Sequence, residues 1–137
     1  MLKFIPIFAH LGISGFESPA AEYTQFSLEL DSLLIDKPSS TYIGLAKGQS
    51  MRGVGIFDGD LLIVDRAAVA KKGDVIVCNL NGEFTCKILD TERACLISAT
   101  KHHQPYFIGE GDEFQVEGVV TRSIRLHRAI NKPLCSL

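Results

Sequence analysis

The sequence predicts a mostly β domain, built as a curved, partly open, barrel-like arrangement of sheets, with a mobile N-terminal arm before it. Short apolar runs with strand character follow one another from residue 41 to residue 126. Turn signals separate these runs, and helical periodicity is weak throughout. At 137 residues, with 46% apolar and 22% charged side chains, the chain has room for one sizeable core but not for two large domains.

Residues 1–38 form the predicted arm. Its middle part, residues 12–21, is rich in glycine, serine, proline and alanine, which is typical of an extended or irregular segment. The stretch Asp31–Ile35 predicts a short helix or turn. That element should stop at Lys37, because the residue before a proline avoids helical dihedral angles.

Residues 39–128 form the predicted β domain, and residues 129–137 form a tail to which no role is assigned. The expected strands are Thr41–Ala46, Asp60–Asp65, Asp74–Asn79, Glu83–Leu89, Ala94–Ser98 and Glu113–Leu126. Asn81-Gly82 is a strong signal for a tight hairpin between two of these runs. The runs 61–65 and 74–78 are apolar almost throughout rather than alternating, which predicts strands covered on both faces.

Charge and hydropathy exclude several classes of function. The net charge of −2 and the pI near 6.1 provide no basic field, so we expect no direct sequence-specific DNA binding. No run of about 18 apolar residues is present, so we expect no membrane span. The first residues also lack the layout of a signal peptide.

The four cysteines are Cys78, Cys86, Cys95 and Cys135. They form no CxxC pair and have no nearby histidine at ligand spacing, so we expect neither a metal site nor a cofactor. Three of them lie in apolar runs and are interpreted as small buried hydrophobes. This usage predicts a reducing compartment, the cytoplasm.

Ser50 and Lys87 are the candidate catalytic pair. Ser50 lies in a turn punctuated by glycines, and Lys87 lies within the apolar strand 83–89. In a Ser/Lys hydrolase, lysine replaces histidine as the base that activates the serine hydroxyl. The base must be uncharged, a state that burial of the amine favours. The backbone amides of Gln49 and Ser50 are candidates for the oxyanion hole.

These residue types also have plainer interpretations. A serine beside a glycine is a common turn residue, and a lysine in a strand can extend from an edge into water. The segment 48–65 could be a hairpin and a core strand, with Asp58-Gly59-Asp60 as its turn. His102-His103 is interpreted as an exposed loop pair. The acidic residues within 110–113 are interpreted as a solvated turn, because their spacing is wrong for a calcium loop.

The order of the motifs resembles the LexA/UmuD group of self-cleaving Ser/Lys peptidases. The matching blocks are Gly48–Met51, Gly55–Asp65, the turn Gly73-Asp74, Gly82–Ile88 and Val116–Val120. The resemblance extends from about Phe4 to Arg128. It implies a catalytic domain of the LexA/signal-peptidase type, with Ser50 as nucleophile, Lys87 as general base and no cofactor.

Within this group the chain resembles the UmuD-type branch. LexA-type repressors carry a helix-turn-helix domain before their cleavage site, whereas about fourteen residues precede the equivalent point here. The segment Phe16–Tyr23 resembles the one that follows the UmuD-type cleavage site, which implies Ser14-Gly15 as the scissile bond. Ser14 departs from the alanine or cysteine usual in the family but is also small. Gly15 has no Cβ, so the scissile backbone can approach the nucleophile.

The resemblance implies an accessory subunit of an error-prone translesion DNA polymerase in the bacterial SOS response to DNA damage. Its implied partners are a second copy of the chain in a homodimer, a RecA filament on single-stranded DNA that promotes cleavage, and a UmuC-type Y-family polymerase. Two alternatives stay open. One is a non-cleaving dimeric module that regulates a polymerase, and the other is a LexA-like regulator without its DNA-binding domain.

Overall fold

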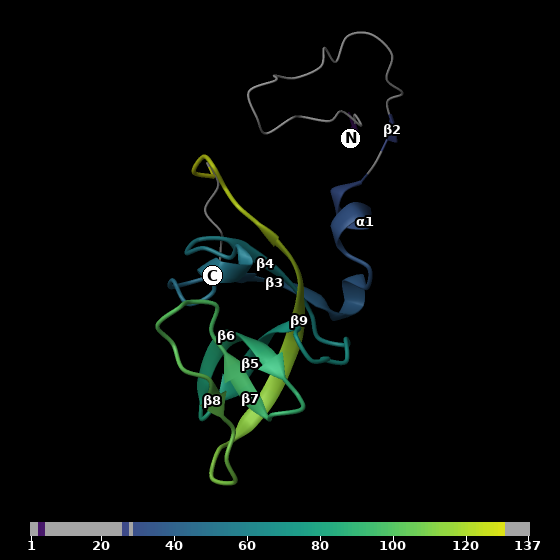
Figure 1. Ribbon diagram of the computed structural model, residues 1–137. Coiled ribbons are helices and arrows are strands. Elements are labelled where there is room, and N and C mark those ends of the chain that lie inside the picture. Colours follow the sequence, from purple (N-terminus) through teal and green to yellow (C-terminus); the bar gives the residue numbers. More distant parts are fainter. Residues whose placement is uncertain (1–2, 5–25, 28, 131–137) are drawn as a thin grey trace. The chain divides into compact units, whose positions relative to one another are not determined.

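The computed structural model describes residues 3–4, 26–27 and 29–130 of the chain (Figure 1). The chain divides into two compact units, Met1–Asp36 and Lys37–Leu137. The predicted domain boundaries after residues 38 and 128 stay predictions. The predicted irregular segment 12–21, which includes Ser14-Gly15, lies outside the described residues.

The first unit contains a short strand pair and a short helix. Strand β1 (Lys3–Phe4) pairs antiparallel with β2 (Phe26–Ser27), a pairing that was not predicted from the sequence. Helix α1 (Leu30–Leu34) lies one residue earlier than the short helix or turn expected there. It gives way at Ile35 to extended backbone, a few residues before the proline that prevents helical continuation.

The second unit is a seven-stranded sheet with the order β3-β4-β9-β5-β6-β7-β8, in which every neighbouring pair is antiparallel. Its strands are β3 (Thr41–Leu45), β4 (Leu61–Asp65), β5 (Val75–Leu80), β6 (Glu83–Asp90), β7 (Cys95–Ile97), β8 (Tyr106–Phe107) and β9 (Phe114–Ile124). Two 3-10 turns accompany them, η1 (Pro38–Ser40) and η2 (Arg52–Val54). The outer strands β3 and β8 do not pair with each other, so the sheet is open. The predicted mostly β, partly open fold is confirmed.

Strand β9 joins the two halves of this sheet. It pairs with β4 near its C-terminal end and with β5 near its N-terminal end, and Figure 1 shows it bending along the unit. The register shifts once against β4, between Ile63 and Val64, and once against β5, between Val77 and Cys78. Such irregularities increase the local twist and bend the strand. One long strand therefore produces the strong curvature of the sheet.

The hairpin between β5 and β6 has the turn that its sequence predicts. Asn81 and Gly82 both take positive φ values, 53° and 88°, as a two-residue turn matched to the strand twist requires. The turn fixes the register, so that Lys87 lies opposite Ile76.

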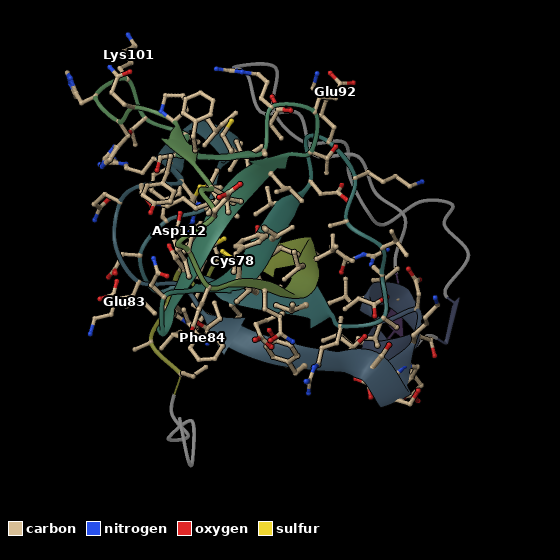
Figure 2. All side chains as sticks on the ribbon, turned by 90° about the horizontal axis from the view of Figure 1, so that it is seen from below. Cys78, Glu83, Phe84, Glu92, Lys101 and Asp112 are labelled. Atoms are coloured by element: carbon tan, nitrogen blue, oxygen red, sulfur yellow. The ribbon has the colours of Figure 1, made fainter. Side chains whose placement is uncertain are left out.

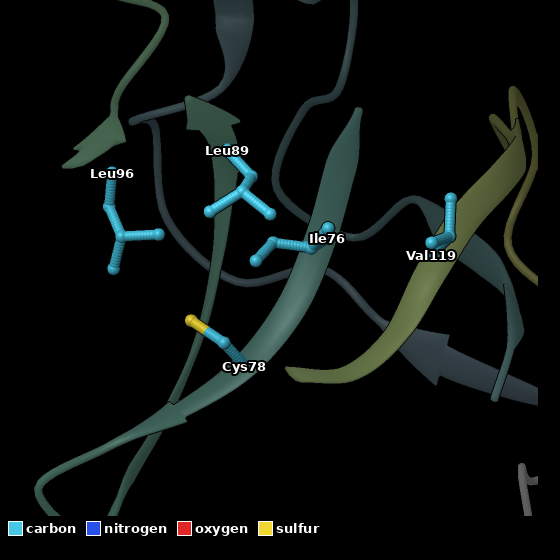
Figure 3. Close-up of a cluster of buried hydrophobic side chains, with 5 residues drawn as sticks. All are labelled: Ile76, Cys78, Leu89, Leu96 and Val119. Atoms are coloured by element: carbon cyan, nitrogen blue, oxygen red, sulfur yellow. The ribbon is translucent and has the colours of Figure 1, made fainter. Parts of the chain in front are cut away.

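Two hydrophobic clusters pack against the sheet. Figure 3 shows the first, which consists of Ile76, Cys78, Leu89, Leu96 and Val119. The second consists of Met51, Ile56, Leu62 and Val64. Residues 62–65 of β4 are all buried, as the unbroken apolar run predicts for a strand covered on both faces.

We predict that Gly118→Ala destabilises the fold. A Cβ atom at residue 118 would lie 2.5 Å from Val64 Cγ1 and 3.1 Å from the Asp65 carbonyl oxygen, and Val64 is fully buried. The substitution should lower the free energy of unfolding by about 1–3 kcal/mol, the usual cost of overpacking. Chemical denaturation measures this change. Gly111→Ala is the control, because a Cβ there meets nothing within 4 Å; equal effects of the two variants would contradict the prediction.

Candidate functional site

The loop between β3 and β4 carries Ser50. Gly48 turns the chain with φ of 99°, a left-handed conformation that glycine adopts without steric cost. Met51, directly after Ser50, is buried in the second hydrophobic cluster. The η2 turn follows and ends at Gly55, which is also left-handed, with φ of 81°. A buried side chain and two glycine turns therefore fix the course of the backbone around Ser50.

Ala99, in the segment after β7, holds the Ser50 loop by its backbone. The Ala99 amide donates to the Ser50 carbonyl oxygen at 2.7 Å, and the Gly53 amide donates to the Ala99 carbonyl oxygen at 2.7 Å. The two bonds resemble a short piece of strand pairing. Ser50 is thus fixed from a part of the chain far away in the sequence.

Lys87 comes from β6, on the other side of the site. Its Nζ donates a hydrogen bond to Ser50 Oγ at 3.1 Å, and both side chains are partly buried. Strand β7 pairs with β6 only over Ile88–Asp90. In the described part of the chain, the edge of β6 beside Lys87 therefore has no strand partner on that side.

The structure brings Ser50 and Lys87 together. No described residue accepts a hydrogen bond from the backbone amide of Gln49 or of Ser50. The predicted scissile bond Ser14-Gly15 lies outside the described residues.

A pocket of about 230 Å³ opens beside Ser50. It lies between the Ser50 loop, β3 and β6, and most of its lining residues are apolar. Tyr42, Val77 and Phe84 also line a neighbouring hollow that contains Arg66 and Glu117. Phe84 is 69% exposed, and Figure 2 labels it. The mostly apolar pocket beside the hydroxyl thus adjoins a hollow with two charged residues, and the exposed Phe84 lines both.

The cysteines near the site are not suited to nucleophilic chemistry. Burial raises the pKa of the Cys86 thiol to about 11, although Lys87 opposes the shift. Burial likewise raises the pKa of the Cys78 thiol to about 11. Thiols of this kind stay protonated at neutral pH and are poor nucleophiles. Both cysteines pack with the hydrophobic clusters, as predicted.

Neither a metal cluster nor a spanning helix is found among the residues described. No group of three or more histidine, cysteine, aspartate or glutamate side chains in this part of the chain could hold a metal ion. In the same part, no helix has the length and apolar character needed to cross a membrane.

Asp58 and Asp60 brace the loop from its far end. Asp58 Oδ1 accepts a hydrogen bond from the Gly48 amide at 2.7 Å, and Asp60 Oδ2 accepts one from the Phe57 amide at 2.8 Å. The sequence indicates these aspartates only as turn residues and gives no signal for Ala99. The Asp58-Gly59-Asp60 motif was the one available signal, because aspartates in turns often bind nearby amides.

Comparison with known proteins gives consistent matches. Residues 9–121 match the family Peptidase S24-like. Protein SamA of Salmonella typhimurium is 36% identical over 124 residues, which cover 90% of this chain and 87% of SamA. Protein MucA of Escherichia coli is 36% identical over 133 residues, covering 96% of this chain and 88% of MucA. Protein ImpA of Escherichia coli is 43% identical over 84 residues, covering 61% of this chain and 58% of ImpA.

We predict that Gly53→Ala displaces the Ser50 loop. A Cβ atom at residue 53 would lie 2.5 Å from the Ala99 carbonyl oxygen, so the hydrogen bond to that oxygen cannot keep its geometry. The free energy of unfolding should fall by about 1–3 kcal/mol. The Gly53-site amide should also exchange faster with solvent, as nuclear magnetic resonance measures.

The control for this variant is Gly44→Ala in β3, where the added Cβ would make only ordinary contact with Leu62 at 3.9 Å. Unchanged exchange at residues 53 and 99 in the Gly53 variant would contradict the prediction.

Proposed function

We propose that this chain, which belongs to the Peptidase S24-like family as a UmuD-type member, cleaves its own N-terminal segment with Ser50 and Lys87. The family is one of serine peptidases and includes self-cleaving members. The observation that carries the proposal is the 3.1 Å separation between Lys87 Nζ and Ser50 Oγ. A general base must be within hydrogen-bond reach of the proton that it removes.

The proposed reaction begins with Lys87 in its uncharged form, because a protonated amine can only donate. The amine takes the hydroxyl proton as Ser50 Oγ attacks the carbonyl carbon of Ser14. The amides of Gln49 and Ser50 stabilise the negative charge that develops on the carbonyl oxygen. Lys87 then gives the proton to the Gly15 amine as the peptide bond breaks.

An ester between Ser50 and the Ser14 carbonyl remains after this first half. In the second half Lys87 takes a proton from a water molecule, whose oxygen attacks the ester carbonyl carbon. Collapse of that intermediate returns the proton to Ser50 Oγ. The net reaction hydrolyses one peptide bond and regenerates both side chains.

Two features of the site support a peptide substrate. The pocket beside Ser50 is mostly apolar, which suits the aliphatic residues that precede Ser14 in the sequence. The edge of β6 beside Lys87 has no described strand partner, so an extended peptide could add there through its backbone. Because substrate and catalyst belong to one chain, or to the two chains of one homodimer, their effective concentration is high and a modest site suffices.

The proposed biological role is that of an accessory subunit in SOS mutagenesis, located in the cytoplasm. A RecA filament on single-stranded DNA would favour the conformation that brings Ser14-Gly15 to Ser50. The shortened homodimer would then act with a UmuC-type Y-family polymerase in translesion synthesis. The family membership and the relatives SamA, MucA and ImpA support this role in its general form.

One sequence feature favours a second candidate, a non-cleaving module that regulates a polymerase. Ser14 replaces the alanine or cysteine that is usual before the scissile glycine. Mass spectrometry of the purified chain after incubation at high pH separates the candidates, because only the peptidase yields a fragment that begins at Gly15.

We predict that Ser50→Ala and Lys87→Ala each abolish self-cleavage while the chain stays folded. Both side chains are partly buried and neither belongs to a core cluster, so their truncation leaves the packing in place. The assay incubates the full chain with RecA filaments on single-stranded DNA and sequences the new N-terminus. Ser123→Ala and Lys101→Ala, at exposed positions outside the pocket, are the matched controls and should be cut at the normal rate. Cleavage at Gly15 by either site variant would rule out this mechanism.

We predict that spontaneous cleavage accelerates as the pH rises from about 7 towards 10. Lysine amines are ordinarily protonated at neutral pH, and the reaction needs the uncharged amine. Initial rates measured without RecA test this, and Lys87→Ala should show no acceleration. A flat profile for the unmodified chain would show that some other group serves as the base.

A further inference from the structure

Arg125 follows the last residue of β9 and contacts three parts of the loop that carries Ser50. Its Nη2 donates to the Gly55 carbonyl oxygen at 2.6 Å. Its Nε and Nη2 donate to the two carboxylate oxygens of Asp60, at 3.2 and 3.0 Å. Its guanidinium carbon lies 3.8 Å from the centre of the Phe57 ring. A single side chain thus binds a carbonyl, a carboxylate and an aromatic ring of one loop.

We infer that Arg125 is a positioning residue that holds the Ser50 loop in its reactive geometry. This inference rests on the proposed function. Arg125 does not line the pocket beside Ser50, so it would act through the loop and not on the substrate.

A short series of contacts leads from Arg125 to Ser50. The Asp60 carboxylate that pairs with Arg125 also accepts the Phe57 amide. Asp58, between them, accepts the Gly48 amide at 2.7 Å and so fixes the glycine turn two residues before Ser50. On the other side of Ser50, Gly55 ends the η2 turn, and Arg125 holds its carbonyl. Arg125 thus holds the Gly55 end of the Ser50 turn directly, and the Gly48 end through Asp58, which lies between Phe57 and Asp60 in the chain.

The chemistry of this contact requires arginine. Asp60 is buried, with 3% exposure, and a buried carboxylate needs a charged partner. The hydrogen bonds from Arg125 are the main cause of the lowered pKa of Asp60. A guanidinium can bind a carboxylate through two nitrogens while stacking on a ring, whereas a lysine ammonium is a point charge. Arg52 lies over the same ring at 5.1 Å, so Phe57 contacts two guanidinium groups.

The test compares three variants of the full chain in the self-cleavage assay. Arg125→Gln should slow cleavage per folded molecule by about 10²-fold, the order of loss expected when a catalytic group shifts by about 1 Å. Arg125→Lys should recover only part of this loss. It restores the charge, but not the two-nitrogen hydrogen bonding to Asp60 or the stacking on Phe57. Arg128→Gln, an exposed arginine of the same segment, is the matched control and should cleave at the normal rate.

Hydrogen exchange supplies a readout independent of cleavage. In Arg125→Gln, the amides of Gly48 and Phe57 should exchange faster than in the unmodified chain, whereas those of Ile76 and Cys78 in the core should not change. Thermal melting gives the folded fraction by which each rate is divided.

Three results would overturn the inference. The first is a cleavage rate in Arg125→Gln equal to that in Arg128→Gln. The second is a loss of cleavage in Arg125→Gln that the unfolded fraction fully explains. The third is a full recovery of the cleavage rate in Arg125→Lys. If the unmodified chain does not cleave itself, the proposed function fails. Hydrogen exchange then tests separately whether Arg125 holds the Ser50 loop. Unchanged exchange at Gly48 and Phe57 then refutes that role.

Discussion

The paired hydrogen bonds between Ala99 and the Ser50 loop are the constraint on which the site depends. Ser50 lies in a loop, and a loop alone could not keep a hydroxyl within 3.1 Å of an amine on a strand. The Ala99 backbone bonds Ser50 and Gly53 and ties the loop to the segment after β7. Because β7 pairs with β6, the loop and Lys87 belong to one hydrogen-bonded framework. The distance between the Ser50 hydroxyl and the Lys87 amine is therefore a property of the sheet.

The curvature of the sheet also helps to bring Ser50 and Lys87 together. Met51 and Ile56 of the Ser50 loop pack on Leu62 and Val64 of β4, and β9 joins β4 to the β5–β6 hairpin. Since β9 shifts register against both neighbours, it bends where a regular strand would run straight. This bend allows a loop from the β3–β4 side to lie near a lysine from β6. The apolar contacts of the loop then stabilise the arrangement.

Local patterns predicted much of this structure. Six expected strands correspond to β3, β4, β5, β6, β7 and β9, because apolar runs between glycine-containing turns are local signals. The Asn81-Gly82 turn was also predictable, since its backbone needs residues that accept positive φ. Strand β8 was missed, because it has two residues, both exposed, and so leaves no apolar pattern.

The two central residues of the site were predictable from the sequence, but the contacts that hold the Ser50 loop in place were not. Resemblance and residue chemistry pointed to Ser50 and Lys87, while their proximity depends on pairings between distant segments. Ala99 and Arg125 reach the Ser50 loop from 49 and 75 positions away, if counted from residue 50. An alanine carries no chemical signal when only its backbone acts. An arginine near the end of a strand resembles any other solvated charge.

The two-residue turn at Asn81-Gly82 makes the chain sensitive to insertions and deletions in this hairpin. Side chains alternate between the faces of a strand, so slipping β6 by one residue against β5 would move Lys87 to the face now occupied by Cys86 and Ile88. The amine would then be replaced at the hydroxyl by a neutral neighbour, although composition and hydropathy would hardly change. A relative with an odd-length insertion in this hairpin would keep its sheet and lose the lysine from its place beside the serine.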